Sequence, residues 1–212
     1  MTRAQLLQLA TLVQGLLAIA SLGLAWLVGI NPFDRVQLTS TSAALGIFGT
    51  IPMLLVFTLT YRSRLRPFRE IRDFLTEALG PTLAECRWYD LAWIAFLAGY
   101  SEELLFRGVL HAWLNHWGSG TGLLVSNALF AAVHAVTPTY ALLAGLQGMI
   151  LGCLFEYADP GNLLVPILAH TLYDLIALEV VRRGFLRQLP SVEAVRDDVQ
   201  IEDVSEGGQR PN

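Results

Sequence analysis

Hydrophobic residues in this chain gather in six long stretches that are separated by polar or helix-breaking residues. Most of the stretches approach the roughly 20 apolar residues that an α-helix needs to cross the hydrocarbon core of a bilayer. Asn31-Pro32, Thr137-Pro138 and Asp159-Pro160-Gly161 supply breaks between them. The six predicted spans are Leu6–Ile30, Ser42–Tyr61, Asp90–Trp117, Gly122–Val136, Tyr140–Tyr157 and Leu163–Val181, with approximate boundaries.

The segment between the second and third spans has a different pattern. Apolar residues recur at helical spacing with charges between them, which is typical of an amphipathic helix lying on a membrane surface. They are Phe68, Ile71, Phe74, Leu75 and Leu79. The positive-inside rule predicts that this arginine-rich segment is cytoplasmic, and with six spans both termini are then cytoplasmic too. Its arginines are Arg62, Arg64, Arg66, Arg69 and Arg72.

Composition supports a membrane protein. The 212 residues are 54% hydrophobic and only 15% charged, whereas soluble domains are roughly 45–50% apolar and about 25% charged. The first apolar stretch is longer than the core of a signal peptide and lacks a clear cleavage site, so a retained helix is predicted instead. Cys86 and Cys153 lie far apart in the sequence, and this predicts no disulfide framework. The predicted fold class is an all-α, polytopic membrane helix bundle with one interfacial amphipathic helix.

The third span begins at Asp90 and carries three further charged residues in its interior, Glu102, Glu103 and Arg107. A charge at the bilayer centre costs at least about 2.5–3.5 kcal/mol, so these side chains are expected to face the interior of the bundle. Glu103 and Arg107 are four residues apart and can pair on one helix face. Glu102 lies about 100° around the helix and can stay free for chemistry. His111 continues the stripe and is interpreted as a hydrogen-bond partner between helices.

Two further spans carry matching polar residues. His134 follows Phe130 by four residues in the fourth span, and Asp174 follows His170 by four residues in the sixth. A site built from Glu102, His134, His170 and Asp174 would combine a carboxylate base, two imidazoles and a second carboxylate. Such a set suits the activation of water, with or without a metal ion.

These residues resemble the three motifs of a known family. Glu102-Glu103-x-x-x-Arg107, Phe130-x-x-x-His134 and His170-x-x-x-Asp174 are similar to EExxxR, FxxxH and HxxxN/D. These are the motifs of the CPBP family, the CAAX proteases and bacteriocin-processing enzymes that are also called Abi proteins. The resemblance covers about Trp88 to Val181, and the first two spans and the C-terminal segment lie outside it.

The resemblance implies an intramembrane endopeptidase. By analogy, Glu102 is the general base that takes a proton from water, and His134 helps to hold that water. His170 and Asp174 stabilise the oxyanion, and Glu103 with Arg107 forms a supporting ion pair. A purely structural role for that ion pair is the alternative interpretation.

Asp174 departs from the asparagine of well-studied members, and an ionised aspartate cannot donate a hydrogen bond. Asp174 is therefore protonated, orients His170, or binds a metal. Two histidines with carboxylates also form an acceptable zinc set. The favoured expectation is that no metal is tightly bound.

The chain is accordingly divided into four parts. Residues 1–61 form two transmembrane helices, 62–87 the cytoplasmic surface segment, 88–183 the catalytic membrane core, and 184–212 an acidic, disordered tail. The expected partners are a peptide or membrane-protein substrate and the lipid bilayer, and nothing indicates nucleic-acid binding. A proton-coupled transporter is the alternative function, because buried acids and histidines also build proton relays. A non-catalytic scaffold of the same fold is a third reading.

Overall fold

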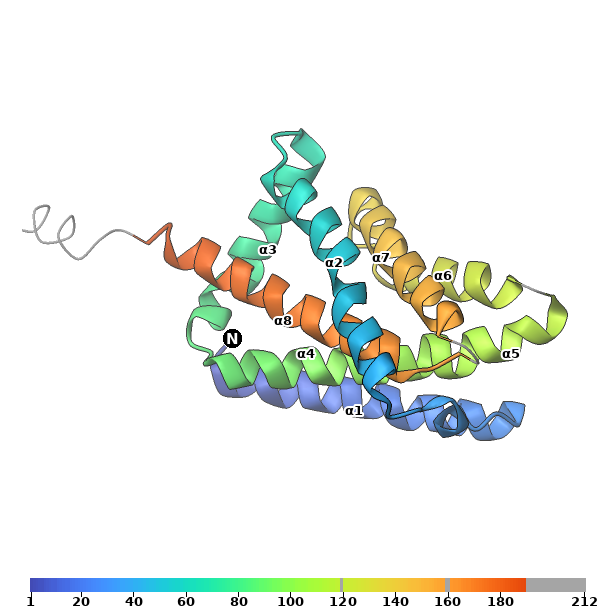
Figure 1. Cartoon of the computed structure of the whole chain (residues 1–212). Coiled ribbons are helices and arrows are strands. Elements are labelled where there is room, and N and C mark those ends of the chain that lie inside the picture. Colours follow the sequence, from blue (N-terminus) through green and yellow to red (C-terminus); the bar gives the residue numbers. More distant parts are fainter. Residues whose placement is uncertain (119, 159–160, 190–212) are drawn as a thin grey trace, which may run out of the picture.

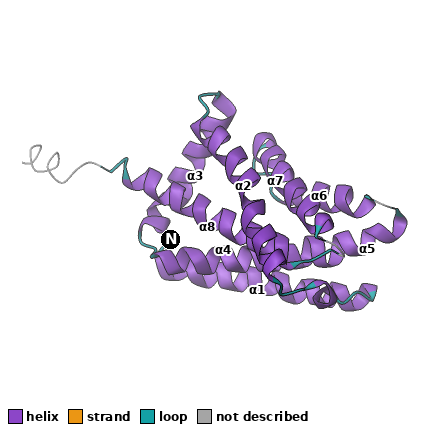
Figure 2. Ribbon diagram, in the orientation of Figure 1, coloured by secondary structure: helices purple, strands orange, loops and turns teal. Residues whose placement is uncertain are grey.

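The computed structural model describes residues 1–118, 120–158 and 161–189, and this part of the chain is helical without strands (Figures 1 and 2). Segment η2 is π-helical, and η1 and η3 are short 3₁₀ turns. In chain order the elements are α1 Arg3–Val28, η1 Pro32–Arg35, α2 Ser40–Arg62, α3 Arg66–Ala84, α4 Trp88–Glu103, η2 Leu104–His111, α5 Ala112–Leu114, η3 Asn115–Trp117, α6 Thr121–Val133, α7 Pro138–Tyr157 and α8 Leu164–Leu186.

Four helices in the described residues, α1, α2, α7 and α8, are long and apolar enough to cross a membrane. The predicted all-α membrane helix bundle is confirmed, and the chain is an integral membrane protein. The other two predicted spans differ from the expectation. Helix α4 has 16 residues before the helical rod changes to π geometry, and α6 has only 13. Charged residues interrupt the apolar character of the α4–η2 rod. Helix α6 ends where His134 leaves helical geometry.

Helix α3 is amphipathic, as the spacing of its apolar residues predicts. Ile71 and Leu83 are buried on one side, whereas Arg66 and Glu70 are exposed on the other. The buried side packs against α8 (Figure 1). Helix α8 continues to Leu186, so it extends beyond the boundary after residue 183 at which the acidic tail was predicted to begin. Most of that predicted tail, residues 190–212, lies outside the described residues.

Helix α8 runs through the middle of the bundle and packs against α2, α3 and α4, while α6 and α7 pack against each other (Figure 1). The crossing of α4 with α8 is close because Gly99 has no side chain. A Cβ atom on Gly99 would lie 2.9 Å from the backbone nitrogen of Thr171 and 3.2 Å from the carbonyl oxygen of Ile167. This close approach brings the end of α4 next to the middle of α8, where both carry titratable residues.

Helix α1 lies along α4 (Figure 1). At one end, Arg3 donates from Nε and Nη2 to the two carboxylate oxygens of Asp90, at 2.7 and 2.6 Å. Further along, the indole nitrogen of Trp93 donates to the hydroxyl of Thr11 at 3.0 Å. These contacts fix the position of α1 along α4, although most of its large apolar side chains are exposed on the outside of the bundle.

Both cysteines have free thiols, with Cys86 buried and Cys153 exposed. The prediction of no disulfide is confirmed.

Candidate active site

The charged residues of the third predicted span lie where α4 changes into the π-helical segment η2. Helix α4 ends at Glu103, and the same rod continues from Leu104 to His111 in π geometry. A π segment takes up extra residues per turn, and such segments occur frequently at functional sites. Arg107 lies in the middle of this segment and is buried.

Glu103 and Arg107 form the predicted ion pair in the interior of the bundle. The distance from Arg107 Nη1 to Glu103 Oε1 is 2.8 Å, and the two side chains are 1% and 0% exposed. Arg107 Nη2 also donates to the carbonyl oxygen of Gly148 on α7 at 2.5 Å. The guanidinium carbon lies 4.9 Å from the centre of the Phe130 ring on α6. One buried arginine thus connects three helical elements.

His170 of α8 contacts the same ion pair. Its Nδ1 lies 2.8 Å from Glu103 Oε1, the oxygen that also accepts from Arg107. An ionised carboxylate can only accept, so Nδ1 carries a hydrogen. The other ring nitrogen, Nε2, faces Asp174 Oδ2 one helical turn later at 3.6 Å. His170 is therefore flanked by two carboxylates, which would stabilise a positive charge on its ring.

His134 occupies the position at which α6 ends, with φ −97° and ψ 10°. The last carbonyl groups of a helix lack partners within the helix, and His134 Nδ1 lies 2.8 Å from one of them, the oxygen of Phe130. The His134 and Phe130 rings are stacked with their centres 4.4 Å apart. The spacing of four residues therefore fixes the His134 ring by a hydrogen bond and by stacking.

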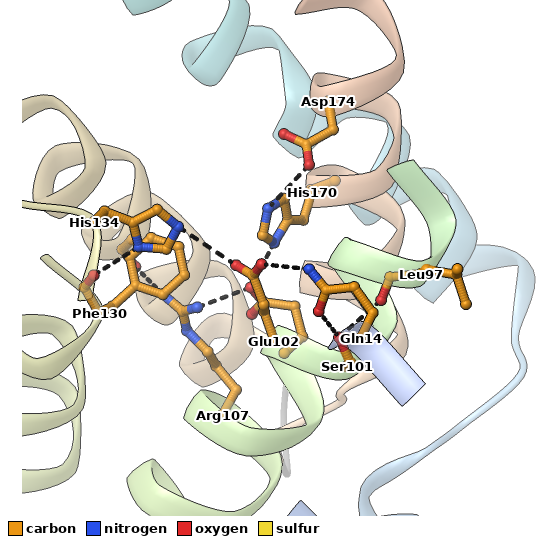
Figure 3. Close-up of polar contacts among 12 residues, drawn as sticks. Gln14, Leu97, Ser101, Glu102, Arg107, Phe130, His134, His170 and Asp174 are labelled. Carbon is orange, nitrogen blue, oxygen red and sulfur yellow. Dashed lines mark hydrogen bonds and ion pairs between the residues drawn. The ribbon is translucent and has the colours of Figure 1, made fainter. Parts of the chain in front are cut away.

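Glu102 points towards His134 (Figure 3). Its Oε2 lies 3.7 Å from His134 Nε2, which is too long for a direct hydrogen bond. Its Oε1 accepts from Nε2 of Gln14 on α1 at 3.2 Å. The two neighbouring glutamates therefore have separate partners, as their angular separation on the helix predicts.

The proton positions on His134 follow from its partners. A carbonyl oxygen only accepts, so Nδ1 donates to Phe130 and, in the neutral ring, Nε2 is an acceptor. Glu102 Oε2 is buried and has no hydrogen-bond partner in the structure. Two acceptors, Glu102 Oε2 and His134 Nε2, thus face each other across 3.7 Å. A group that donates two hydrogens, such as water, fits between two acceptors.

The structure contains a pocket of about 290 Å³ next to the two site histidines. His134, His170 and Asp174 line one part of it, and Tyr140 and Gln147 add further polar groups. The remaining lining is largely apolar and comes from α2, α3, α4, α7 and α8; it includes Met53, Phe57, Ile71, Leu75, Ile94, Leu143 and Leu178.

The structure brings together all six residues that were predicted from the sequence. They are Glu102, Glu103, Arg107, His134, His170 and Asp174. His111 lies outside this group and contacts Glu156 of α7, with 3.1 Å between Nε2 and Oε1, which agrees with its interpretation as a partner between helices. Sequence reasoning missed Gln14, although a single carboxamide in an otherwise apolar stretch was a signal that could have identified it.

A metal ion needs several ligand side chains that converge on one point. In residues 1–118, 120–158 and 161–189, no group of three or more His, Cys, Asp or Glu side chains is placed to hold a metal. Nδ1 of His134 and Nδ1 of His170 are engaged by Phe130 and by Glu103, which leaves the Nε2 atom of each ring available. Because no three such side chains of the described residues converge on one point, the proposed chemistry uses the side chains alone. The expectation that no metal is tightly bound stays a prediction.

Comparisons with known proteins identify relatives of part of the chain. Residues 84–176 match the family model described as "Type II CAAX prenyl endopeptidase Rce1-like". A curated relative, the uncharacterized protein YpbD of Bacillus subtilis (strain 168), is 30% identical over 101 residues, which are 46% of this chain and 49% of that protein. The chain thus spans about half the length of this relative. No solved structure matches. The matched residues include all six candidate site residues and exclude α1, α2 and most of α3.

Proposed function

We propose that this protein is an intramembrane endopeptidase in which Glu102 activates the attacking water, since residues 84–176 match the family model of Rce1-like type II CAAX prenyl endopeptidases. The observation that carries the proposal is the pair of acceptors, Glu102 Oε2 and His134 Nε2, that face each other across 3.7 Å, because His134 also lines the pocket. This geometry suits a water molecule about 2.8 Å from both atoms.

In the first step, the water donates one hydrogen to Glu102 and the other to His134. The carboxylate takes the first proton as the water oxygen attacks the carbonyl carbon of the peptide bond. The attack forms a tetrahedral intermediate with a negatively charged oxygen. His134 keeps its hydrogen bond to Phe130 throughout, so its role is to hold the water and not to exchange protons.

His170 supplies the stabilisation of the oxyanion. Its ring lines the pocket, and Nδ1 is held by Glu103 at 2.8 Å. With a proton on both nitrogens, Nε2 is a charged donor for the oxyanion, and such donors are strongest in a site that excludes water. Asp174 at 3.6 Å favours this protonation state and the ring orientation, which supports the orienting role for Asp174 over the other two.

The cycle closes when the carbon–nitrogen bond breaks. Glu102 returns its proton to the leaving amine, which yields a free amine and a carboxylic acid and restores the ionised glutamate. Glu103 and Arg107 take no part in proton transfer, because both are fully buried and engaged with each other. Their contribution is to hold His170 in place.

The pocket indicates the kind of substrate. A largely apolar lining next to the polar residues suits a peptide that carries a large apolar group near the bond to be cleaved. A prenylated CAAX peptide has this character, and the family resemblance points to the same class. A bacteriocin-like peptide is the alternative substrate for the same hydrolytic reaction.

The test uses the purified protein in liposomes with an internally quenched, farnesylated CAAX peptide. We expect cleavage by the wild type and a loss of at least about a thousandfold for Glu102→Gln, because the base is removed. Glu156→Gln is the matched control and should retain the activity, since Glu156 contacts His111, which the proposed reaction does not use.

Two outcomes would overturn this proposal. Cleavage by Glu102→Gln at the wild-type rate would remove Glu102 as the base. Proton-coupled uptake of a solute by the same liposomes, without cleavage of any tested peptide, would instead support the transporter.

The membrane orientation is part of the proposal. The arginines that flank and begin α3, including Arg62, Arg64 and Arg66, favour a cytoplasmic location for this surface, with both termini on the same side. Reporter fusions that are active only on one side of the membrane test this. Activity of an N-terminal fusion on the outside would contradict it.

A further inference from the structure

Helix α1 lies outside the residues that match the family model, yet it contributes a side chain to the candidate site. Gln14 Nε2 donates to Glu102 Oε1 at 3.2 Å. On its other side, Gln14 Oε1 accepts from the hydroxyl of Ser101 at 2.5 Å. Figure 3 shows the amide of Gln14 between Ser101 and Glu102.

The orientation of this amide is determined by its two neighbours. The carboxylate of Glu102 only accepts, so it must face the NH₂ group of Gln14. The Ser101 hydroxyl has a single hydrogen, which it can donate either to the amide oxygen or to the carbonyl oxygen of Leu97 at 2.9 Å. Donation to the amide oxygen matches the orientation that Glu102 requires, and Ser101 is buried next to this amide.

The contact distinguishes the two oxygens of Glu102. Gln14 engages Oε1, and Oε2 is left directed at His134. Rotation of the carboxylate would move Oε2 away from the position that a water shared with His134 requires. We infer that Gln14 is a positioning residue that fixes the rotation of the Glu102 carboxylate, so that the N-terminal helix completes the active site. This inference rests on the proposed function of Glu102 as the base.

The rest of α1 explains how Gln14 reaches this point. Arg3 and Thr11 contact α4 through Asp90 and Trp93, and the positions 3, 11 and 14 fall on one face of a helix. Thr11 is one turn before Gln14 and is bonded to a residue that the proposed reaction does not use. Thr11→Val therefore removes a polar contact between the same two helices without affecting Glu102.

The kinetic test compares Gln14→Leu with Thr11→Val on the farnesylated CAAX peptide. Loss of a hydrogen bond to a charged group should reduce kcat about tenfold or more with KM unchanged, because the substrate-binding pocket is intact. Thr11→Val should stay within about twofold of the wild type. Ser101→Ala should lower kcat in the same direction, and the double variant should be no slower than Gln14→Leu, because both residues act through one amide.

A second measurement needs no substrate. Dicyclohexylcarbodiimide modifies protonated carboxyl groups in apolar surroundings, and mass spectrometry gives its rate of reaction at Glu102. The reagent bonds to a carboxyl oxygen, and Gln14 engages Oε1 of Glu102. Gln14→Leu should therefore raise this rate several-fold at fixed pH, while Thr11→Val should leave it unchanged.

The two measurements separate the possible failures. If no tested peptide is cleaved by the wild type but labelling responds to Gln14→Leu, the proposed function fails and the contact to Glu102 stands. If the wild type cleaves the peptide and Gln14→Leu matches Thr11→Val in both measurements, the positioning role is refuted. A fall in kcat that Thr11→Val reproduces would show a merely structural effect of α1 and would also refute it.

Discussion

Replacement of Arg107 by methionine gives the sharpest test of how the site is held together. The guanidinium group makes an ion pair with Glu103 at 2.8 Å, a hydrogen bond to the Gly148 carbonyl at 2.5 Å and a contact with the Phe130 ring at 4.9 Å. Methionine fills part of the same volume without a charge. The change leaves Glu103 fully buried and in contact with His170 but without its arginine.

The magnitude follows from the burial of the pair. Breaking a buried ion pair by removing one partner costs about 3–5 kcal/mol, because the other charge stays in the interior without that partner. For a chain of this size, that loss corresponds to a fall in Tm of about 6–20 °C. His170 also loses a firmly held partner, so cleavage of the test peptide should fall together with stability.

The assay is thermal unfolding of the purified protein in bicelles, followed by circular dichroism. Arg66→Met is the matched control, since Arg66 and Glu70 have the same four-residue spacing at 2.7 Å but are 82% and 60% exposed. Exposed pairs contribute little to stability, and this variant should melt with the wild type. Equal melting temperatures for Arg107→Met and Arg66→Met would refute the view that the buried pair stabilises the site.

Four further predictions concern other parts of the structure. Gly148→Ala should destabilise the fold by about 1–3 kcal/mol in the same melting assay, because the added Cβ would lie 3.3 Å from Arg107 Nη2 and 2.9 Å from Phe130. Asp174→Asn should lower kcat for the test peptide without changing KM, because His170 loses one of its two flanking carboxylates. Incubation with 1,10-phenanthroline should leave the cleavage rate unchanged, because the proposed mechanism uses side chains alone. Burial raises the pKa of the Cys86 thiol above its ordinary value, so the reactive thiolate is scarce at pH 7 and labelling by maleimide should be slow there and rise as the pH approaches the raised pKa.

Each of these predictions has a clear contrary result. Wild-type melting of Gly148→Ala would mean that the α6–α7 contact tolerates a methyl group. Faster cleavage by Asp174→Asn would favour a donor role for this side chain, and inhibition by the chelator that zinc reverses would favour a metal. Rapid labelling of Cys86 at neutral pH would place its thiol in a more polar environment than the structure indicates.

The parts of the site that the sequence predicted are those that depend on local geometry. The two residues of each pair, Glu103 with Arg107 and His170 with Asp174, are four positions apart in the same helical rod. Helix geometry alone therefore brings the members of each pair near each other. The separate orientation of Glu102 follows from the same geometry. The cost of burying charge in a bilayer then explains why these residues face inwards together.

The parts that the sequence did not predict depend on how helices are placed against each other. The contact of Gln14 with Glu102 joins residues 88 positions apart, and it depends on the position of α1 along α4, which no periodicity encodes. The π geometry of η2 also has no marker in the sequence. It changes the direction of the residues beyond it, and His111 accordingly contacts Glu156 and not the Glu103–Arg107 pair.

The location of the buried ion pair within a single rod has a consequence for biosynthesis. Glu103 and Arg107 can neutralise each other as soon as their own helix forms, before any later span has been made. His170 follows Glu103 by 67 residues, which at about 5–20 residues per second is a delay of roughly 3–13 s on the ribosome. During this interval the nascent segment enters the bilayer with Glu103 and Arg107 already compensated, and the arrival of α8 then completes the candidate active site.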